Sequence, residues 1–209
     1  MTRGEGGRPA VVVTLGDKLP DMLVDGLVAD LRAAGIDAAL LRTSSGPFAG
    51  VELYLPTAAA VFLGSAYLAG MAQKAGEDHY EVVKGVTRRL YRRVANALRA
   101  DPLGSRGKLS KNRVFSMTYS IVGEVRPGLR FKLLVRTDME SKDVEKGIGA
   151  FLDLIRELNS GEIATERLAP LLTYRPVGGT VLVTFDAASG RILPVRMDGT
   201  IDMSGEMPE

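Results

Sequence analysis

The sequence predicts an α+β protein with an N-terminal β-α-β(-β) unit, a central helical hairpin and a C-terminal β-β-α-β-β unit. In the last unit we expect an antiparallel sheet with a helix on one face. Three observations lead to this prediction. A valine-rich run is followed by leucines spaced four residues apart, two long segments have the amphipathic period of a helix, and two pairs of alternating segments flank turn residues.

The N-terminal unit follows a Gly-rich polar tail at residues 1–9. The run 10–15 (AVVVTL) has the apolar, β-branched composition of a buried strand. Leucines at four-residue intervals then predict a helix that ends before Gly35. The run 36–41 (IDAALL) predicts a parallel second strand, reached by a right-handed crossover. Residues 51–55 (VELYL) predict a third strand.

The helical hairpin begins in a run without charge, residues 53–72. This run has the length of a membrane span. However, Pro56 and the high content of alanine and glycine favour a buried helix from residue 57. A second helix over about 77–99 completes the hairpin. The stretch DPLGSRGKLSKN at 101–112 then has the composition of a linker.

The C-terminal unit opens with alternating apolar and polar side chains in residues 113–125 and 129–135, on either side of an Arg-Pro-Gly turn. This pattern predicts a β-hairpin. An apolar stripe predicts a helix over 141–158. Residues 180–185 and 191–195 flank a second turn and predict a second hairpin.

The predicted organisation combines these segments along the chain. It comprises a tail at 1–9, a first unit at 10–100, a basic linker at 101–112, a second unit at 113–197, which includes a short helix at 165–172, and an acidic tail at 198–209. A single compact domain is the alternative, because 209 residues suffice for one core or for two small ones.

Positive charge is concentrated in one segment, although the formal net charge of the chain is only +2. Residues 84–113 contain ten basic residues and one acid, so this segment carries +9 and the rest of the chain about −7. On a helical projection of residues 82–99, the cations lie on one side and the apolar residues on the other. The ten candidate binding residues are Lys84, Arg88, Arg89, Arg92, Arg93, Arg99, Arg106, Lys108, Lys111 and Arg113.

Three interpretations of this basic segment stay open. The first is a solvated helix face, partly neutralised by acids elsewhere, such as Glu140, Asp143 and Glu145. The second is an anionic partner, either an acidic protein or a nucleic acid, because guanidinium groups bind carboxylates and phosphates with two hydrogen bonds. Within residues 84–113 only Tyr91 offers base stacking, and no helix-turn-helix, RNP or zinc-finger pattern is present. The third is a membrane surface contacted through residues 53–99.

Catalytic chemistry has little support in the sequence. The chain has no cysteine, which excludes disulfides, thiolate metal sites and cysteine nucleophiles. His79 is the sole histidine, and the acids around it suit the first turn of a helix. A G-x-S-x-G motif is absent. We therefore predict no catalytic residue, no metal and no cofactor.

The function that the sequence favours is a non-enzymatic binding or regulatory module. We expect the basic helix at about 77–99 and the linker to engage an acidic protein partner. Nucleic-acid binding through the same residues and membrane association are the alternatives. The abundance of arginine and alanine indicates a bacterial origin, and the N-terminus does not resemble a secretory signal, so we expect a cytoplasmic protein.

Overall fold

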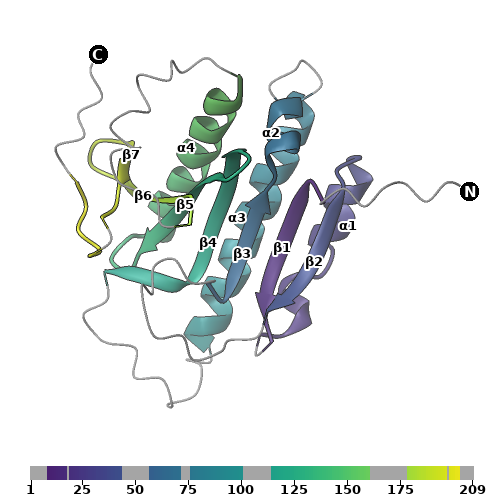
Figure 1. The fold of residues 1–209 in the computed structure, drawn as a ribbon. Helices are drawn as coiled ribbons and strands as arrows, with labels where there is room; N and C mark the ends of the chain where they lie inside the picture. Colours follow the sequence, from purple (N-terminus) through teal and green to yellow (C-terminus); the bar gives the residue numbers. More distant parts are fainter. Residues whose placement is uncertain are drawn as a thin grey trace, which may run out of the picture.

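A seven-stranded mixed sheet carries a layer of helices on one face (Figure 1). This arrangement confirms the predicted α+β class and the helix-on-one-face packing. The strands of the C-terminal unit are mixed rather than all antiparallel, because the helix Ser141–Ser160 connects two strands that run parallel. The computed structural model describes residues 9–17, 19–43, 57–71, 76–100, 114–160, 178–196 and 198–202. The third strand predicted at 51–55, the linker at 101–112 and the short helix at 165–172 lie outside these described residues.

The strands lie in the order β2-β1-β3-β4-β5-β6-β7 across the sheet. Their bounds are Val11–Gly16 (β1), Ala38–Thr43 (β2), Ala59–Leu63 (β3), Phe115–Arg126 (β4), Leu129–Arg136 (β5), Thr180–Asp186 (β6) and Arg191–Pro194 (β7). The pairs β1/β2, β3/β4 and β5/β6 are parallel, and helices connect the two strands of each pair. The pairs β1/β3, β4/β5 and β6/β7 are antiparallel. Because β3 pairs directly with β4, one sheet runs through both predicted units.

The helices that connect the parallel strands pack on one another as well as on the sheet. Their bounds are Asp21–Leu23 (the 3-10 helix η1), Leu27–Ala33 (α1), Ser65–Met71 (α2), Gly76–Ala100 (α3) and Ser141–Ser160 (α4). Helix α3 contacts both α1 and α4, and one hydrophobic cluster joins all these helices to the strands. The helices predicted at about 77–99 and 141–158 and both predicted hairpins are confirmed.

The helix predicted between the first two strands is interrupted in the structure. Gly26 adopts a φ of 73°, in the left-handed region that glycine enters without steric cost, and it separates η1 from α1. Leu19, Leu23, Leu27 and Leu31 are nevertheless all buried. The leucine spacing therefore identifies the correct core residues, although Leu19 precedes the helices, Leu23 ends η1, and only Leu27 and Leu31 lie in α1.

The prediction of one buried helix in the apolar run 53–72 is wrong. Residues 59–63 form β3, in the middle of the sheet, and the short helix α2 begins only at Ser65. Strand pairing with β1 and β4 on both sides gives this segment its backbone hydrogen bonds. That tertiary pairing overrides the helix preference of alanine. Among the described residues, no helix is both long enough and apolar enough to cross a membrane.

A smaller hydrophobic cluster lies outside the main core, at the β7 end of the sheet. Its buried members are Phe115, Leu134, Leu182 and Val195. Residues 198–202, which the sequence assigns to the acidic tail, fold back here, because Val195 forms a β-bridge with Ile201. The buried Asp202 carboxylate accepts a hydrogen bond from Arg196 Nη2 at 3.1 Å.

Candidate partner-binding face

Helix α3 directs its apolar side toward the sheet and its cations away from it. Val83, Val86, Leu90 and Val94 are each at most 1% exposed. The buried Tyr119 hydroxyl of β4 donates a hydrogen bond to the Thr87 carbonyl of α3 at 2.9 Å. We define the basic face of α3 as five cationic side chains that share the other side of the helix: Lys84, Arg88, Arg89, Arg92 and Arg93.

Two cations of the basic face reach toward the N-terminal segment. Arg89 Nη2 lies 2.7 Å from Asp30 Oδ2 of α1, in an ion pair whose side chains are 41% and 46% exposed. One turn further along α3, Arg93 Nη1 donates to the carbonyl oxygens of Leu23 at 3.3 Å and Asp25 at 2.8 Å. The i, i+4 spacing of Arg89 and Arg93 places both on the α1 side of the helix.

Two further cations reach toward α4. Arg92 Nε lies 3.6 Å from Glu145 Oε1, and Arg88 Nη2 donates to the Glu145 carbonyl oxygen at 3.2 Å. Gly149 makes room for this contact, since a β-carbon there would lie 3.3 Å from Arg88 Nη2. The basic face therefore lines the junction between α3 and α4.

The fifth cation, Lys84, belongs to a cluster around Tyr80. Lys84 Nζ lies 4.9 Å from the centre of the Tyr80 ring, Arg156 lies 4.8 Å from it, and Glu81 lies 3.6 Å from Lys84 Nζ. The Tyr80 hydroxyl donates to Asp153 Oδ1 of α4 at 2.5 Å. Burial, and then this hydrogen bond, raise the pKa of Tyr80 above its ordinary value.

The contacts leave the basic face with more positive than negative charge. Among the described residues, its five cations contact three carboxylates, those of Asp30, Glu81 and Glu145. Arg88 and Arg93 are held by carbonyl oxygens, which orient a guanidinium group without neutralising its charge. Arg92 is the most exposed of the ion-paired cations of this face, at 56% of its side chain.

The structure thus brings together five of the ten cations singled out in the sequence. Arg99 is in α3, but its side chain is outside the described part. Arg106, Lys108, Lys111 and Arg113 also lie outside it. Of the acids expected to neutralise the helix, Glu145 contacts it, whereas Glu140 and Asp143 pair with the neighbouring lysines Lys142 and Lys146.

Three features of this face were missed by sequence reasoning or differ from it. The partner Asp30 and the carbonyls near α1 have no local sequence signal, because they come from a distant segment. Tyr91, the residue considered for base stacking, is only 9% exposed and packs edge-on against Tyr119 at 5.6 Å between ring centres.

His79, the sole histidine, lies outside the basic face and stacks on Tyr67, with 6.4 Å between the ring centres. In the described ranges, no group of three or more His, Asp or Glu side chains is placed to hold a metal ion.

Comparisons of this chain with protein-family models, with curated proteins and with solved structures found no match. We therefore infer its function from the fold and from the geometry of the basic face.

Proposed function

We propose that this chain is a non-enzymatic binding module that engages an acidic protein partner through the basic face of α3. The observation that supports this most is the way in which Arg88 and Arg93 are fixed. Both are oriented by backbone carbonyls, and among the described residues no carboxylate pairs with either of them. A guanidinium group that is already oriented loses less conformational entropy when it binds a carboxylate.

The mixed charge of this face favours a protein over a nucleic acid. The carboxylates of Asp30, Glu81 and Glu145 are interspersed among the cations, and they would repel the continuous negative charge of a phosphate backbone. A protein surface can place acids opposite the arginines and cations opposite these carboxylates. Tyr91 also packs inside the fold, which removes the aromatic contact considered for nucleic-acid bases.

Binding to two labelled probes, a glutamate-rich peptide and a random-sequence DNA duplex, tests this proposal by fluorescence anisotropy. We expect the peptide to bind, and we expect the double variant Arg89→Glu, Arg92→Glu to weaken it by about tenfold or more. Affinity should fall as salt is raised, because both arginines are partly exposed.

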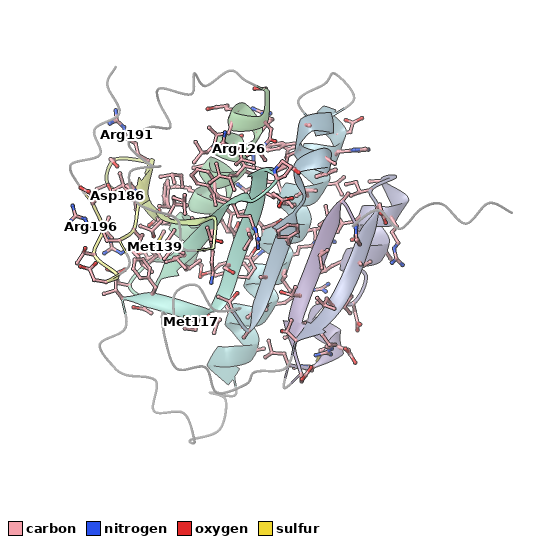
Figure 2. All side chains as sticks on the ribbon, viewed as in Figure 1. Met117, Arg126, Met139, Asp186, Arg191 and Arg196 are labelled. Atoms are coloured by element: carbon pink, nitrogen blue, oxygen red, sulfur yellow. The ribbon has the colours of Figure 1, made fainter. Side chains whose placement is uncertain are left out.

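The matched control is the double variant Arg126→Glu, Arg191→Glu, which makes the same charge change elsewhere. Both residues are exposed, and Arg191 lies at the β7 edge of the sheet (Figure 2). Thermal melting checks that both variants fold. Equal weakening by the two double variants, no peptide binding, or stronger binding of the DNA duplex would each contradict an acidic protein partner; the last outcome would favour the nucleic-acid alternative.

A further inference from the structure

The two edges of the sheet differ in their protection against an added strand. At one edge, β7 ends at Pro194, which has no N–H group, and the Asp202 N–H donates to the Pro194 carbonyl at 3.1 Å. At the other edge, β2 has only β1 as a neighbour among the described strands. Strand β2 contains neither proline nor lysine, and its register with β1 is continuous from Ala38 to Thr43. Proline, lysine and an interrupted register commonly prevent a further strand from pairing with an exposed edge, and β2 has none of the three.

The register shows which backbone groups of β2 face outward. Val11 N–H donates to the Asp37 carbonyl at 3.0 Å, and Asp17 N–H donates to the Thr43 carbonyl at 3.1 Å. Odd-numbered residues of β2 therefore direct their backbone groups toward β1. Because these groups alternate in direction along a strand, those of the even-numbered residues point to the outer edge.

One of the outward groups already has a partner within the chain. The Ala38 carbonyl accepts a hydrogen bond from Arg32 Nε of α1 at 3.0 Å. The outward N–H and C=O groups of Leu40 and Arg42 face no strand among the described residues. The accessible part of this edge is therefore short, and it is centred on Leu41.

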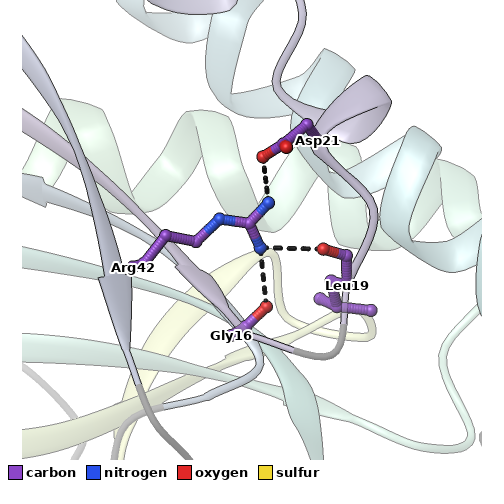
Figure 3. A network of polar contacts seen from close by, with 4 residues as sticks. All are labelled: Gly16, Leu19, Asp21 and Arg42. Atoms are coloured by element: carbon purple, nitrogen blue, oxygen red, sulfur yellow. Dashed lines mark hydrogen bonds and ion pairs between the residues drawn. The ribbon is translucent and has the colours of Figure 1, made fainter.

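The side chains at this edge suit an apolar contact. Leu40 is 41% exposed and Leu41 is 54% exposed, and alternation places them on opposite faces of the sheet. Arg42 is the one charged residue of β2, and its guanidinium group is turned back into the chain (Figure 3). Its Nη1 donates to the carbonyls of Gly16 at 2.9 Å and Leu19 at 2.8 Å, while Nη2 pairs with Asp21. The Arg42 charge therefore does not hinder another strand from pairing with this edge.

We propose that two copies of the chain pair antiparallel along β2, with the twofold axis at Leu41, so that the sheet continues from one copy into the other. In this register, Leu40 lies opposite Arg42 of the partner subunit, and Arg42 lies opposite Leu40 of the partner subunit. All the outward N–H and C=O groups of these residues are then paired. The Ala38 carbonyl remains with Arg32.

The alternative axis at Leu40 is less favourable. It would direct the backbone N–H of Arg42 of the partner subunit at the Ala38 carbonyl, where Arg32 Nε is already bound. The axis at Leu41 instead places Leu41, the most exposed leucine of the strand, against Leu41 of the partner subunit, on the face opposite the helices. Charge does not oppose the pairing, because Asp21 neutralises Arg42 in each copy.

The first test measures the mass of the full chain in solution by light scattering over a range of protein concentrations. We expect a dimer that Leu41→Lys weakens by about tenfold or more, because two lysines would then face each other on the axis. The control Val114→Lys makes the same change at another exposed apolar residue, 50% exposed, outside β2. A wild-type chain that stays monomeric, or equal weakening by both variants, would overturn the proposal.

The second test identifies the register by disulfide trapping, which is clean because the chain has no cysteine. Opposed residues in a pair that lacks hydrogen bonds have Cα atoms about 4.5 Å apart, within the range of a disulfide. Leu41→Cys should therefore form a crosslinked dimer under mild oxidation. The two copies of Leu40 are offset diagonally by about 7–8 Å, so Leu40→Cys should crosslink poorly. More efficient crosslinking by Leu40→Cys would overturn the axis at Leu41.

Discussion

Gly147 of α4 packs so closely on Phe185 of β6 that a β-carbon at residue 147 would lie 2.8 Å from Phe185 Cβ. Unbonded carbon atoms prefer a separation of about 3.5–4.0 Å. Phe185 is only 6% exposed and is held in a strand that is paired on both sides, so it has little room to move. The absence of a side chain at residue 147 therefore sets the distance between α4 and the sheet.

Gly147→Ala should destabilise the protein by about 1–3 kcal/mol, because the added methyl group forces α4 away from β6. Gly149→Ala is the matched control on the same helix. Its methyl group would lie 3.3 Å from Arg88 Nη2 and 3.6 Å from Lys84 Cε, so only a small shift of these side-chain ends is needed, and alanine favours a helix over glycine by about 1 kcal/mol. We expect that control to be neutral or mildly stabilising. Urea unfolding measures both, and equal effects of the two substitutions would contradict the close packing on Phe185.

Lys132 supplies a prediction about pH. It is 3% exposed in the middle of β5, and burial lowers its pKa from the ordinary 10.5 to about 8. Below about pH 8 the lysine is charged in both the folded and the unfolded chain, so the cost of burying the charge is fully present. Between about pH 8 and 10.5 the unfolded chain binds more protons, and the folded state gains stability as the pH rises.

We therefore expect the free energy of unfolding of the wild type, relative to Lys132→Met, to increase by up to about 1.4 kcal/mol per pH unit across this window. Taking the difference between the two proteins removes the contributions of the tyrosines, because both proteins contain the same tyrosines and the ordinary pKa of tyrosine, about 10, lies in the same pH window. Lys132→Leu should give the same slope, since both variants remove the charge. Urea unfolding at several pH values measures it, and a difference that stays flat from pH 8 to 10.5 would show that the Lys132 pKa is not lowered.

The hydrogen bond between Tyr80 and Asp153 ties α3 to α4 and gives a third prediction. Tyr80→Phe removes the donor, and Asp153→Asn removes the charge of the acceptor. A double-mutant cycle should show a coupling of about 1–2 kcal/mol, because the Tyr80 hydroxyl is bonded to a charged group. Thermal or urea unfolding of the four proteins measures this coupling. The pair Lys142 and Glu140, which is largely exposed, serves as the comparison and should couple by less than about 1 kcal/mol. Additive effects at Tyr80 and Asp153 would contradict a direct bond.

Particular elements show how far the sequence could predict this fold. Helix α4 and the hairpin β4–β5 were predicted closely, because their apolar periods and the turn at 127–128 are local properties. The break at Gly26 was missed, since the leucine spacing runs through it without interruption. The sequence predicts a helix where strand β3 lies, because the alanines of β3 carry no strand signal and only the pairing with β1 and β4 selects an extended backbone.

The candidate site likewise combines features that the sequence predicts with features that only the tertiary structure shows. The clustering of cations on α3 was visible in the sequence, because residues three and four apart share a helix face. The sequence could not show that Arg93 binds the carbonyls of Leu23 and Asp25, or that Arg42 binds those of Gly16 and Leu19. Backbone acceptors have no residue-type signature, so only the tertiary structure identifies them.

The sequence by itself determined the fold class, the two long amphipathic helices, both hairpins and the concentration of positive charge. Each of these depends on residues that are close in the chain. Only the tertiary structure decided that one sheet runs through both units, that Lys132 is buried, and that β2 forms an edge whose one charge is turned inward. Those features depend on which distant segments pack together, and the free energy of that packing is a property of the whole fold.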